Sequence, residues 1–297
     1  MRQPRLGTRK LHFLLQEQAR AELRVGRDRL FRVLAEQRLL VAPKRAYHKT
    51  THSFHRFYRH PNLLKPGPQQ VLPSAPERVW VADITYLPSL SGPLYLSLVT
   101  DAYSRKIVGH HVHDSLHAES VARAFSLALQ RRRTRHALVH HSDRGIQYCS
   151  AHYQRLHARH GITCSMTDGY DCYQNALAER VNGILKNELL IQPPADLAQA
   201  RRMVHEAVDI YNRERPHHAL KYKTPDAMHR AFLRSGANPQ RCKPISGLDT
   251  AFRWRRARSA FSDVRQALWC LPRSGRATHA IPAFRYRPLG VLLQPDR

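Results

Sequence analysis

The sequence lacks long apolar runs, paired cysteines and enough acidic residues to balance its basic ones. No apolar run approaches the ~18–20 residues of a membrane span, and the opening "MRQPRLGTRKLHFLL" does not resemble a secretory signal peptide. The cysteines are odd in number and form no CxxC pair, which argues against a disulfide framework and a zinc ribbon. They are Cys149, Cys164, Cys172, Cys242 and Cys270. This pattern suits a reducing cytoplasm.

The shortage of acidic residues points to a polyanionic partner. The 49 lysines and arginines face 22 aspartates and glutamates, giving a net charge of +27 and a pI of about 10.9. The excess is uneven: residues 1–78 carry +12 and residues 233–297 carry +10, whereas residues 79–232 carry only +5. Such basic segments gain affinity by releasing counterions from phosphates, so the charge predicts binding to nucleic acid.

The N-terminal segment predicts a small helical module. Residues 8–40 have helical apolar spacing on both sides of "RVGR", where Gly26 supplies the turn. A helix-turn-helix-like module over residues 1–45 fits this pattern, with Arg27, Arg29 and Arg32 facing DNA phosphates. Any basic helical hairpin would give the same pattern. Residues 46–78, rich in proline, basic residues and aromatics without periodicity, are expected to be a basic linker.

Residues 79–232 have the regularity of a packed domain, and residues 233–297 do not. Three apolar strands come first, followed by alternating helices and strands, which predicts an α/β fold with a mixed five-stranded sheet flanked by helices. The expected strands cover 79–88, 94–104, 106–116, 136–143 and 162–166, and the expected helices cover 118–132, 151–161, 174–190 and 197–216. Residues 233–297 are expected to be an irregular basic tail, for which disorder is one interpretation. This tail is either a genuine DNA-binding segment or read-through into another frame.

Three acidic residues are candidates for catalysis and metal binding. Asp83 lies inside the first strand, Asp143 closes the fourth strand, and Glu179 lies on the helix expected over 174–190. A carboxylate in a core strand is costly to desolvate unless it is paired or binds a cation, although Asp143 alone could cap a turn. Oxygen ligands select Mg²⁺ or Mn²⁺, and two such ions could activate a water or a 3′-hydroxyl at a phosphodiester.

The helix "QNALAERVNGILKNELL" at 174–190 also carries a polar stripe. At about 100° per residue, Asn175, Glu179, Asn182 and Lys186 gather opposite the apolar arc. One interpretation is an ordinary solvated face. The other, which we favour beside the three acids, is that Lys186 holds a DNA phosphate while Asn175 and Asn182 bind DNA or support Glu179.

The motifs resemble those of a known family. Between Asp143 and Glu179 lie 35 residues, and Lys186 follows Glu179 by seven positions. This is similar to the D,D(35)E pattern of retroviral integrases and bacterial transposases. Five blocks resemble, in order, the second-reading-frame product of the IS-three family of insertion sequences: "VWVADITYLP", "TDAYSRKIVGHHV", "HHSDRGIQYCS", "YQNALAERVNGILKNEL" and "YNRERPHHALKYKTPDAMH". The segment from Gly7 resembles the helical module that precedes this core.

The resemblance implies a ribonuclease-H-like fold and a DNA transposase that cleaves and transfers strands with two Mg²⁺ (or Mn²⁺) ions. It assigns Asp83, Asp143 and Glu179 to the catalytic metal-binding triad and Lys186 to the family's trailing basic residue. Asp101, in the second block, we assign to structure. Expected partners are double-stranded DNA at element ends and targets, the product or fusion of an upstream frame, and further copies of the chain. The alternatives are a non-catalytic DNA-binding remnant or regulator and a nuclease acting on RNA–DNA hybrids.

Overall fold

A computed structural model describes residues 3, 5–18, 25–41, 60–168 and 175–234 of the chain. Most of residues 233–297, part of the expected linker and Gln174 therefore lie outside the described residues. Within the described part, no helix is both long and apolar enough to cross a membrane. The helices are α1 (Thr8–Gln18), α2 (Arg27–Glu36), α3 (Ala118–Gln130), α4 (Ile146–Cys149), α5 (Ala151–Arg159), α6 (Ala176–Ile184), α7 (Leu197–Arg213) and α8 (Pro225–Arg234). Helices α1 and α2 lie where the sequence predicts them; the helix-turn-helix assignment stays a prediction.

The expected mixed sheet of five strands is confirmed. The strands are β1 (Val79–Ser89), β2 (Gly92–Asp101), β3 (Ile107–His113), β4 (Val139–Ser142) and β5 (Thr163–Met166), in the spatial order β3-β2-β1-β4-β5. Strands β1, β2 and β3 pair antiparallel, as short connections allow, whereas β4 and β5 join in parallel after helical crossovers. Strand β1 is therefore central, with β2 on one side and β4 on the other.

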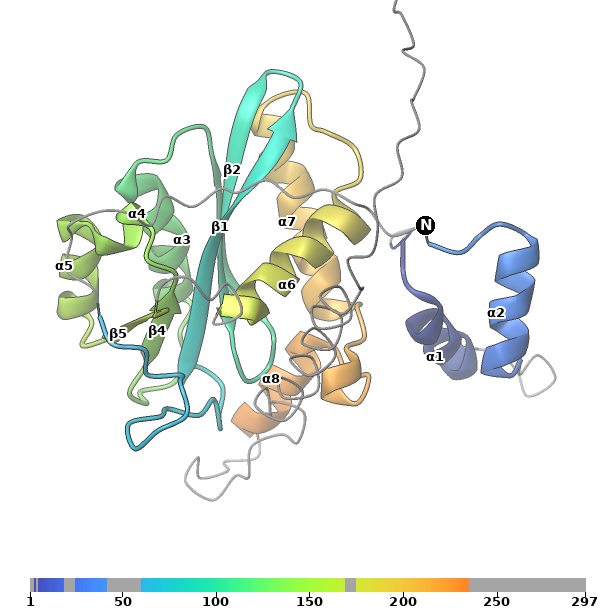
Figure 1. Cartoon of the computed structure of the whole chain (residues 1–297), viewed down its shortest axis with the longest axis horizontal. Coiled ribbons are helices and arrows are strands. Elements are labelled where there is room, and N and C mark those ends of the chain that lie inside the picture. The colour runs from blue at the N-terminus through green and yellow to red at the C-terminus, as the bar shows by residue number, and fades with distance from the viewer. Residues whose placement is uncertain (1–2, 4, 19–24, 42–59, 169–174, 235–297) are drawn as a thin grey trace, which may run out of the picture. The chain divides into compact units, whose positions relative to one another are not determined.

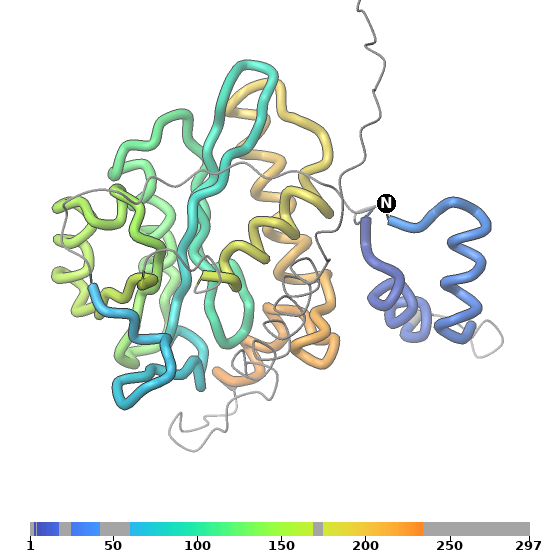
Figure 2. Tube along the Cα trace, in the orientation of Figure 1, coloured from blue at the N-terminus to red at the C-terminus, as the bar shows by residue number. Residues whose placement is uncertain are grey.

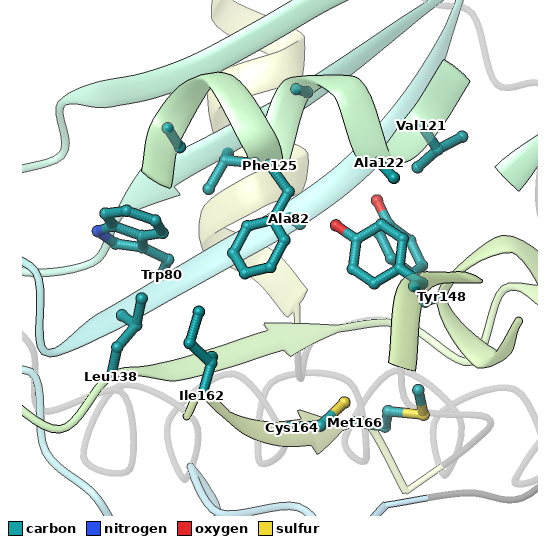
Figure 3. Close-up of a cluster of buried hydrophobic side chains, with 14 of the residues drawn as sticks. Trp80, Ala82, Val121, Ala122, Phe125, Leu138, Tyr148, Ile162, Cys164 and Met166 are labelled. Carbon is teal, nitrogen blue, oxygen red and sulfur yellow. The ribbon is translucent and has the colours of Figure 1, made fainter. Parts of the chain in front are cut away.

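Helices cover both faces of the sheet (Figure 1). Helices α3, α4 and α5 cover one face, and α6 and α7 cover the other; the Cα trace shows the same three layers (Figure 2). On the first face, Trp80 and Ala82 of β1 point toward Phe125 of α3 (Figure 3). The Trp80 and Phe125 rings meet edge to face with centroids 6.2 Å apart.

Strand alternation sends the other residues of β1 toward α6. Val79 and Val81 pack in a cluster with Ala178 of α6, opposite the face that holds Trp80 and Ala82. Because successive side chains of a strand alternate between faces, Asp83 continues the row of Val79 and Val81. The carboxylate therefore lies on the α6 side of the central strand.

Gly109 of β3 allows α3 to approach the sheet closely. A Cβ atom at this position would overlap the Ala124 carbonyl oxygen and lie 2.9 Å from the Ala128 Cβ. We expect Gly109→Ala to lower the free energy of unfolding by about 3 kcal/mol, because α3 must move away from β3. Urea denaturation measures this change.

The matched control is Gly183→Ala in α6, where the nearest atom to an added Cβ is Asn187 Nδ2 at 3.9 Å. This substitution should raise stability by roughly 0.5–1 kcal/mol, since alanine loses less backbone entropy than glycine in a helix. If both substitutions had the same effect, the close approach at Gly109 would not be what limits the packing of α3.

Candidate active site

Two of the predicted acids lie on neighbouring strands. Val79, Trp80 and Val81 of β1 are in parallel register with Val139, His140 and His141 of β4. Continuing this register by two residues brings Asp83 beside Asp143, which directly follows the end of β4. Segments 60 residues apart in the sequence thus bring two carboxyl groups side by side on the same face of the sheet.

Asp83 is surrounded by groups that act on its charge in opposite directions. Its Oδ2 accepts a hydrogen bond from Asn182 Nδ2 at 2.8 Å, and its Oδ1 accepts one from the Ile84 backbone N–H at 2.9 Å. Burial, followed by the negative charges of Asp143 and Glu179, raises the pKa of Asp83 to about 8, against the effect of the two hydrogen bonds. Without a cation, this site favours a protonated Asp83.

Glu179 and Asp143 complete the group of predicted acids. Glu179 lies in the first turn of α6, and much of its side chain is open to solvent. The part of the side chain that is covered, and then the charge of Asp143, raise the pKa of Glu179. Asp143 Oδ1 accepts a hydrogen bond from the Gly145 N–H at 3.0 Å, so this carboxylate also caps a turn. The charges of the three acids act on one another, but within the described ranges no three His, Cys, Asp or Glu side chains already form a group that could hold a metal ion.

The carboxamides of Asn175 and Asn182 are placed differently from the expectation. We expected both to lie on an open polar face, yet each residue is only 4% exposed. Asn175 precedes the first turn of α6, and its Nδ2 donates to the Ala82 carbonyl oxygen at 3.0 Å. Asn182 faces β1 and holds Asp83 rather than Glu179. These two residues are not on an open face: their Nδ2 groups tie α6 to β1, because a buried amide needs a partner within the protein. Contact of Asn175 and Asn182 with DNA stays a prediction.

Lys186 lies at the far end of the same helix. A π-helical turn, η3 (Leu185–Leu189), continues α6 and changes its angular spacing from this point. Lys186 Nζ is 3.4 Å from the Tyr86 carbonyl oxygen of β1. Partial burial lowers the pKa of Lys186, whereas the charge of Asp83 raises it. The ammonium group thus remains on the β1 side, near the acids.

The three arginines predicted to bind DNA lie on the exposed surface of α2. Arg27, Arg29 and Arg32 are all exposed, and Arg27 Nε also donates to Asp28 Oδ1 at 2.9 Å. An exposed ion pair of this kind contributes little and would yield readily to a phosphate. DNA binding by α2 stays a prediction.

Asp101 belongs to a buried polar network, in line with the structural role assigned to it. Its Oδ1 accepts from the Ser104 N–H at 2.8 Å and from Ser104 Oγ at 2.6 Å, and its Oδ2 accepts from the Glu77 N–H at 2.6 Å. Ser104 Oγ is 3.0 Å from His229 Nδ1 of α8. This link to α8 joins residues 125 positions apart and could not be predicted from local spacing. The only signal for it was the presence of serine and histidine within the two blocks.

A central strand carrying one acid, a parallel neighbour ending in a second, and a covering helix carrying a third define the integrase-core class with a ribonuclease-H-like fold. Two family models, both described as integrase core domain, match residues 73–172 and 160–225. The chain belongs to the insertion-sequence transposase family that carries this domain, as its relatives establish.

One relative is the "Insertion element IS600 uncharacterized 31 kDa protein" of Shigella sonnei, 37% identical over 78% of this chain and 84% of that protein. The "Putative transposase for insertion sequence element IS986/IS6110" of Mycobacterium tuberculosis is 33% identical, over 59% and 64% of the two chains. The "Transposase InsF for insertion sequence IS3A" of Escherichia coli is 35% identical, over 53% and 54%. The chain thus spans less than two thirds of the last two relatives.

Among solved structures, the HTLV-2 integrase catalytic core domain in complex with magnesium is similar, with a TM-score of 0.43 and 21% identity. The match covers 52% of this chain and 97% of that domain.

Proposed function

We propose that the chain catalyses Mg²⁺-dependent cleavage and 3′-hydroxyl transfer of DNA strands, with Asp83, Asp143 and Glu179 as the catalytic metal-binding triad. The observation that carries this proposal is the parallel register of β1 and β4, which brings Asp83 beside Asp143. Burial and then the charge of Asp143 raise the pKa of both Asp83 and Glu179. Acids held together in this way repel one another unless they are protonated or share a cation.

The donor set fits a hard divalent cation. The three carboxylates offer only oxygen atoms, the ligands preferred by Mg²⁺ and Mn²⁺. When bound, Mg²⁺ activates the attacking oxygen and offsets charge that develops on the phosphodiester.

Other side chains position the triad and the substrate. Asn182 fixes Asp83 Oδ2 by its 2.8 Å hydrogen bond and so holds one lone pair of the carboxylate in place. Lys186 would bind a phosphate next to the cleaved bond, exchanging its weak 3.4 Å contact with Tyr86 for a charged partner. Arg27, Arg29 and Arg32 of α2 would bind phosphates farther along the duplex. The expected partners are element-end and target DNA, an upstream-frame product or fusion, and further copies of the chain in the cytoplasm.

The proposed activity is tested with the full chain and a labelled duplex that carries the terminal repeat flanking the gene. We expect nicking and strand transfer with Mg²⁺ or Mn²⁺ and none with EDTA, because the acids need a cation to act together. A duplex with a scrambled repeat serves as the control, and gel electrophoresis separates the products.

Two outcomes would support the competing functions. Tight binding to the repeat without strand cleavage in any divalent metal would identify a DNA-binding remnant or regulator. Cleavage of an RNA–DNA hybrid in preference to duplex DNA would identify a hybrid nuclease. Either result would contradict the proposed transposition chemistry.

A further inference from the structure

A further basic surface lies in the turn that joins α3 to β4. Its sequence, "RRRTR", places four arginines within five positions of a core domain whose net charge is only +5. Exposure alternates along the turn: Arg131, Arg133 and Arg135 are exposed, whereas Arg132 and Thr134 are half-buried. Such alternation is typical of an extended segment, so the three exposed arginines share its outer side.

Contacts on the inner side hold the turn in place. Glu77, which is 2% exposed and precedes β1, accepts hydrogen bonds at Oε2 from the N–H groups of Arg133 at 2.9 Å and Thr134 at 2.6 Å. The Arg132 guanidinium points inward and donates to the His136 carbonyl oxygen. The backbone of the turn is therefore fixed without use of the three outer guanidinium groups.

The protein does not offset the charge of these three groups. Within the described ranges, the guanidinium groups of Arg131, Arg133 and Arg135 make no hydrogen bond or ion pair. The Glu77 carboxylate beside the turn is occupied by backbone N–H groups, and its Oε1 lies 3.6 Å from His229 Nε2. Alternate residues of an extended chain lie at most about 7 Å apart, less than the Debye length of about 8 Å in physiological salt, so neighbouring charges repel each other.

A structural role explains only the first of the three arginines. Arg131 is the C-cap of α3, where a cation offsets the partial negative charge of the helix end. This effect fades beyond the last turn of a helix, so it does not account for Arg133 and Arg135. The surrounding sequence supplies no compensating acid either, because no aspartate or glutamate occurs between Glu119 and Asp143.

A phosphate backbone is the partner that suits this surface. Arginine binds phosphate oxygens through a planar fork of N–H donors, and a duplex carries one phosphate charge per about 1.7 Å of its axis. The turn precedes β4 whereas Asp143 follows it, so the four residues of the strand separate the turn from the triad by roughly 13 Å or more. We infer that Arg131, Arg133 and Arg135 form a second DNA-binding surface, which binds the phosphate backbone of a DNA segment away from the triad.

This inference rests on the proposed function only in taking DNA as the partner. The test measures binding of the full chain to a fluorescein-labelled duplex of mixed sequence by fluorescence anisotropy, in EDTA and over a series of salt concentrations. The double variant Arg133→Gln, Arg135→Gln should weaken binding about tenfold or more at the lowest salt. It should also lower the slope of log affinity against log salt by about 1.8, since each phosphate contact contributes about 0.9. Adding Arg131→Gln should lower the slope by about 0.9 more.

Two control variants separate the charge of this turn from charge in general and from folding. The pair Arg202→Gln, Arg213→Gln removes two exposed arginines of α7, on the other face of the sheet, and should leave the slope nearly unchanged. The pair Arg133→Lys, Arg135→Lys keeps both charges and should retain the slope of the wild type. All of these side chains are exposed, so the midpoints of thermal unfolding should match that of the wild type.

Strand cleavage shows whether the surface is separate from the triad. The double glutamine variant should need more DNA for half-maximal cleavage, yet cleave at the wild-type rate when DNA is saturating, because the acids are untouched. A lowered rate at saturating DNA would contradict the separation of the two sites.

Three binding results would overturn the inference. They are a wild-type slope in the double glutamine variant, an equal fall in the α7 control, and a fall in the lysine variant as large as in the glutamine variant. Unchanged duplex binding with weakened binding to phosphatidylserine vesicles would assign the turn to a membrane surface instead. None of these outcomes depends on strand transfer by the wild type, which judges the proposed function. If transfer fails but the losses of binding appear as expected, the second surface stands without the catalytic proposal.

Discussion

Replacing Glu179 with Gln should abolish strand cleavage and transfer while DNA binding remains close to that of the wild type. The substitution keeps the size and shape of an exposed side chain in the first turn of α6, but it removes the negative charge that acts with Asp83 and Asp143. A neutral amide is a poor replacement for a carboxylate ligand, and losing several kcal/mol of transition-state stabilisation slows the reaction at least about a thousandfold. Single-turnover cleavage of the terminal-repeat duplex measures the rate, and fluorescence anisotropy measures binding.

A second glutamate provides the control for charge and helix stability. Glu206 is an exposed residue of α7, so Glu206→Gln removes the same charge without touching the group of three acids. We expect this variant to cleave and transfer DNA at nearly the wild-type rate. Wild-type activity in Glu179→Gln would remove this residue from the mechanism and with it the proposed triad.

The second large effect is expected in stability, and its direction depends on pH. The folded chain raises the pKa of Asp83 to about 8 from an ordinary value of 3.8, so folding favours the protonated carboxyl. The contribution of Asp83 to the free energy of unfolding is therefore fully present below about pH 4. It is lost as the pH rises toward 8, where the carboxyl group must ionise inside the protein. Relative to the wild type in EDTA, Asp83→Asn should raise the free energy of unfolding at pH 8 by on the order of 5 kcal/mol.

Urea denaturation at several pH values checks this prediction. The difference between Asp83→Asn and the wild type should shrink to nothing near pH 4, because Asp83 is then neutral in both the folded and unfolded chain. Mg²⁺ should stabilise the wild type at pH 8 but not Asp83→Asn, since binding to the folded state adds stability only where the ligands are present. The control is Asp114→Asn, an exposed residue after β3, which should show neither effect. A difference that stays constant from pH 4 to pH 8 would contradict the assigned ionisation of Asp83.

The elements of the fold were predictable because their signals are local. The strand expected over 79–88 is β1, and the helix expected over 118–132 is α3, each within two residues at either end. Period-two and period-3.6 spacing reports directly whether a segment is a strand or a helix. Helix α8 was not anticipated, although Thr224 followed by Pro225 is a helix-start signal and Met228 and Phe232 have helical spacing.

The polar stripe of the 174–190 helix shows where such reasoning fails. A uniform helical wheel requires one continuous α-helix, but α6 begins at Ala176, after Asn175, and becomes π-helical at Leu185, before Lys186. The wheel therefore holds only for the residues between these points. Even between these points, the four polar residues do not share one solvated face: Glu179 is exposed, whereas Asn182 is buried.

By itself, the sequence determined the strands, most of the helices, the basic character of both ends and the identity of the three candidate acids. These properties depend on residue type and on spacing within a few turns. Only the tertiary structure decided that Asn182 holds Asp83, that Arg215 is bound by Glu188, and that Asn212 holds the backbone of Ile107. Each of these contacts joins segments far apart in the chain. Which donors find an acceptor is settled only when the sheet and its covering helices pack together.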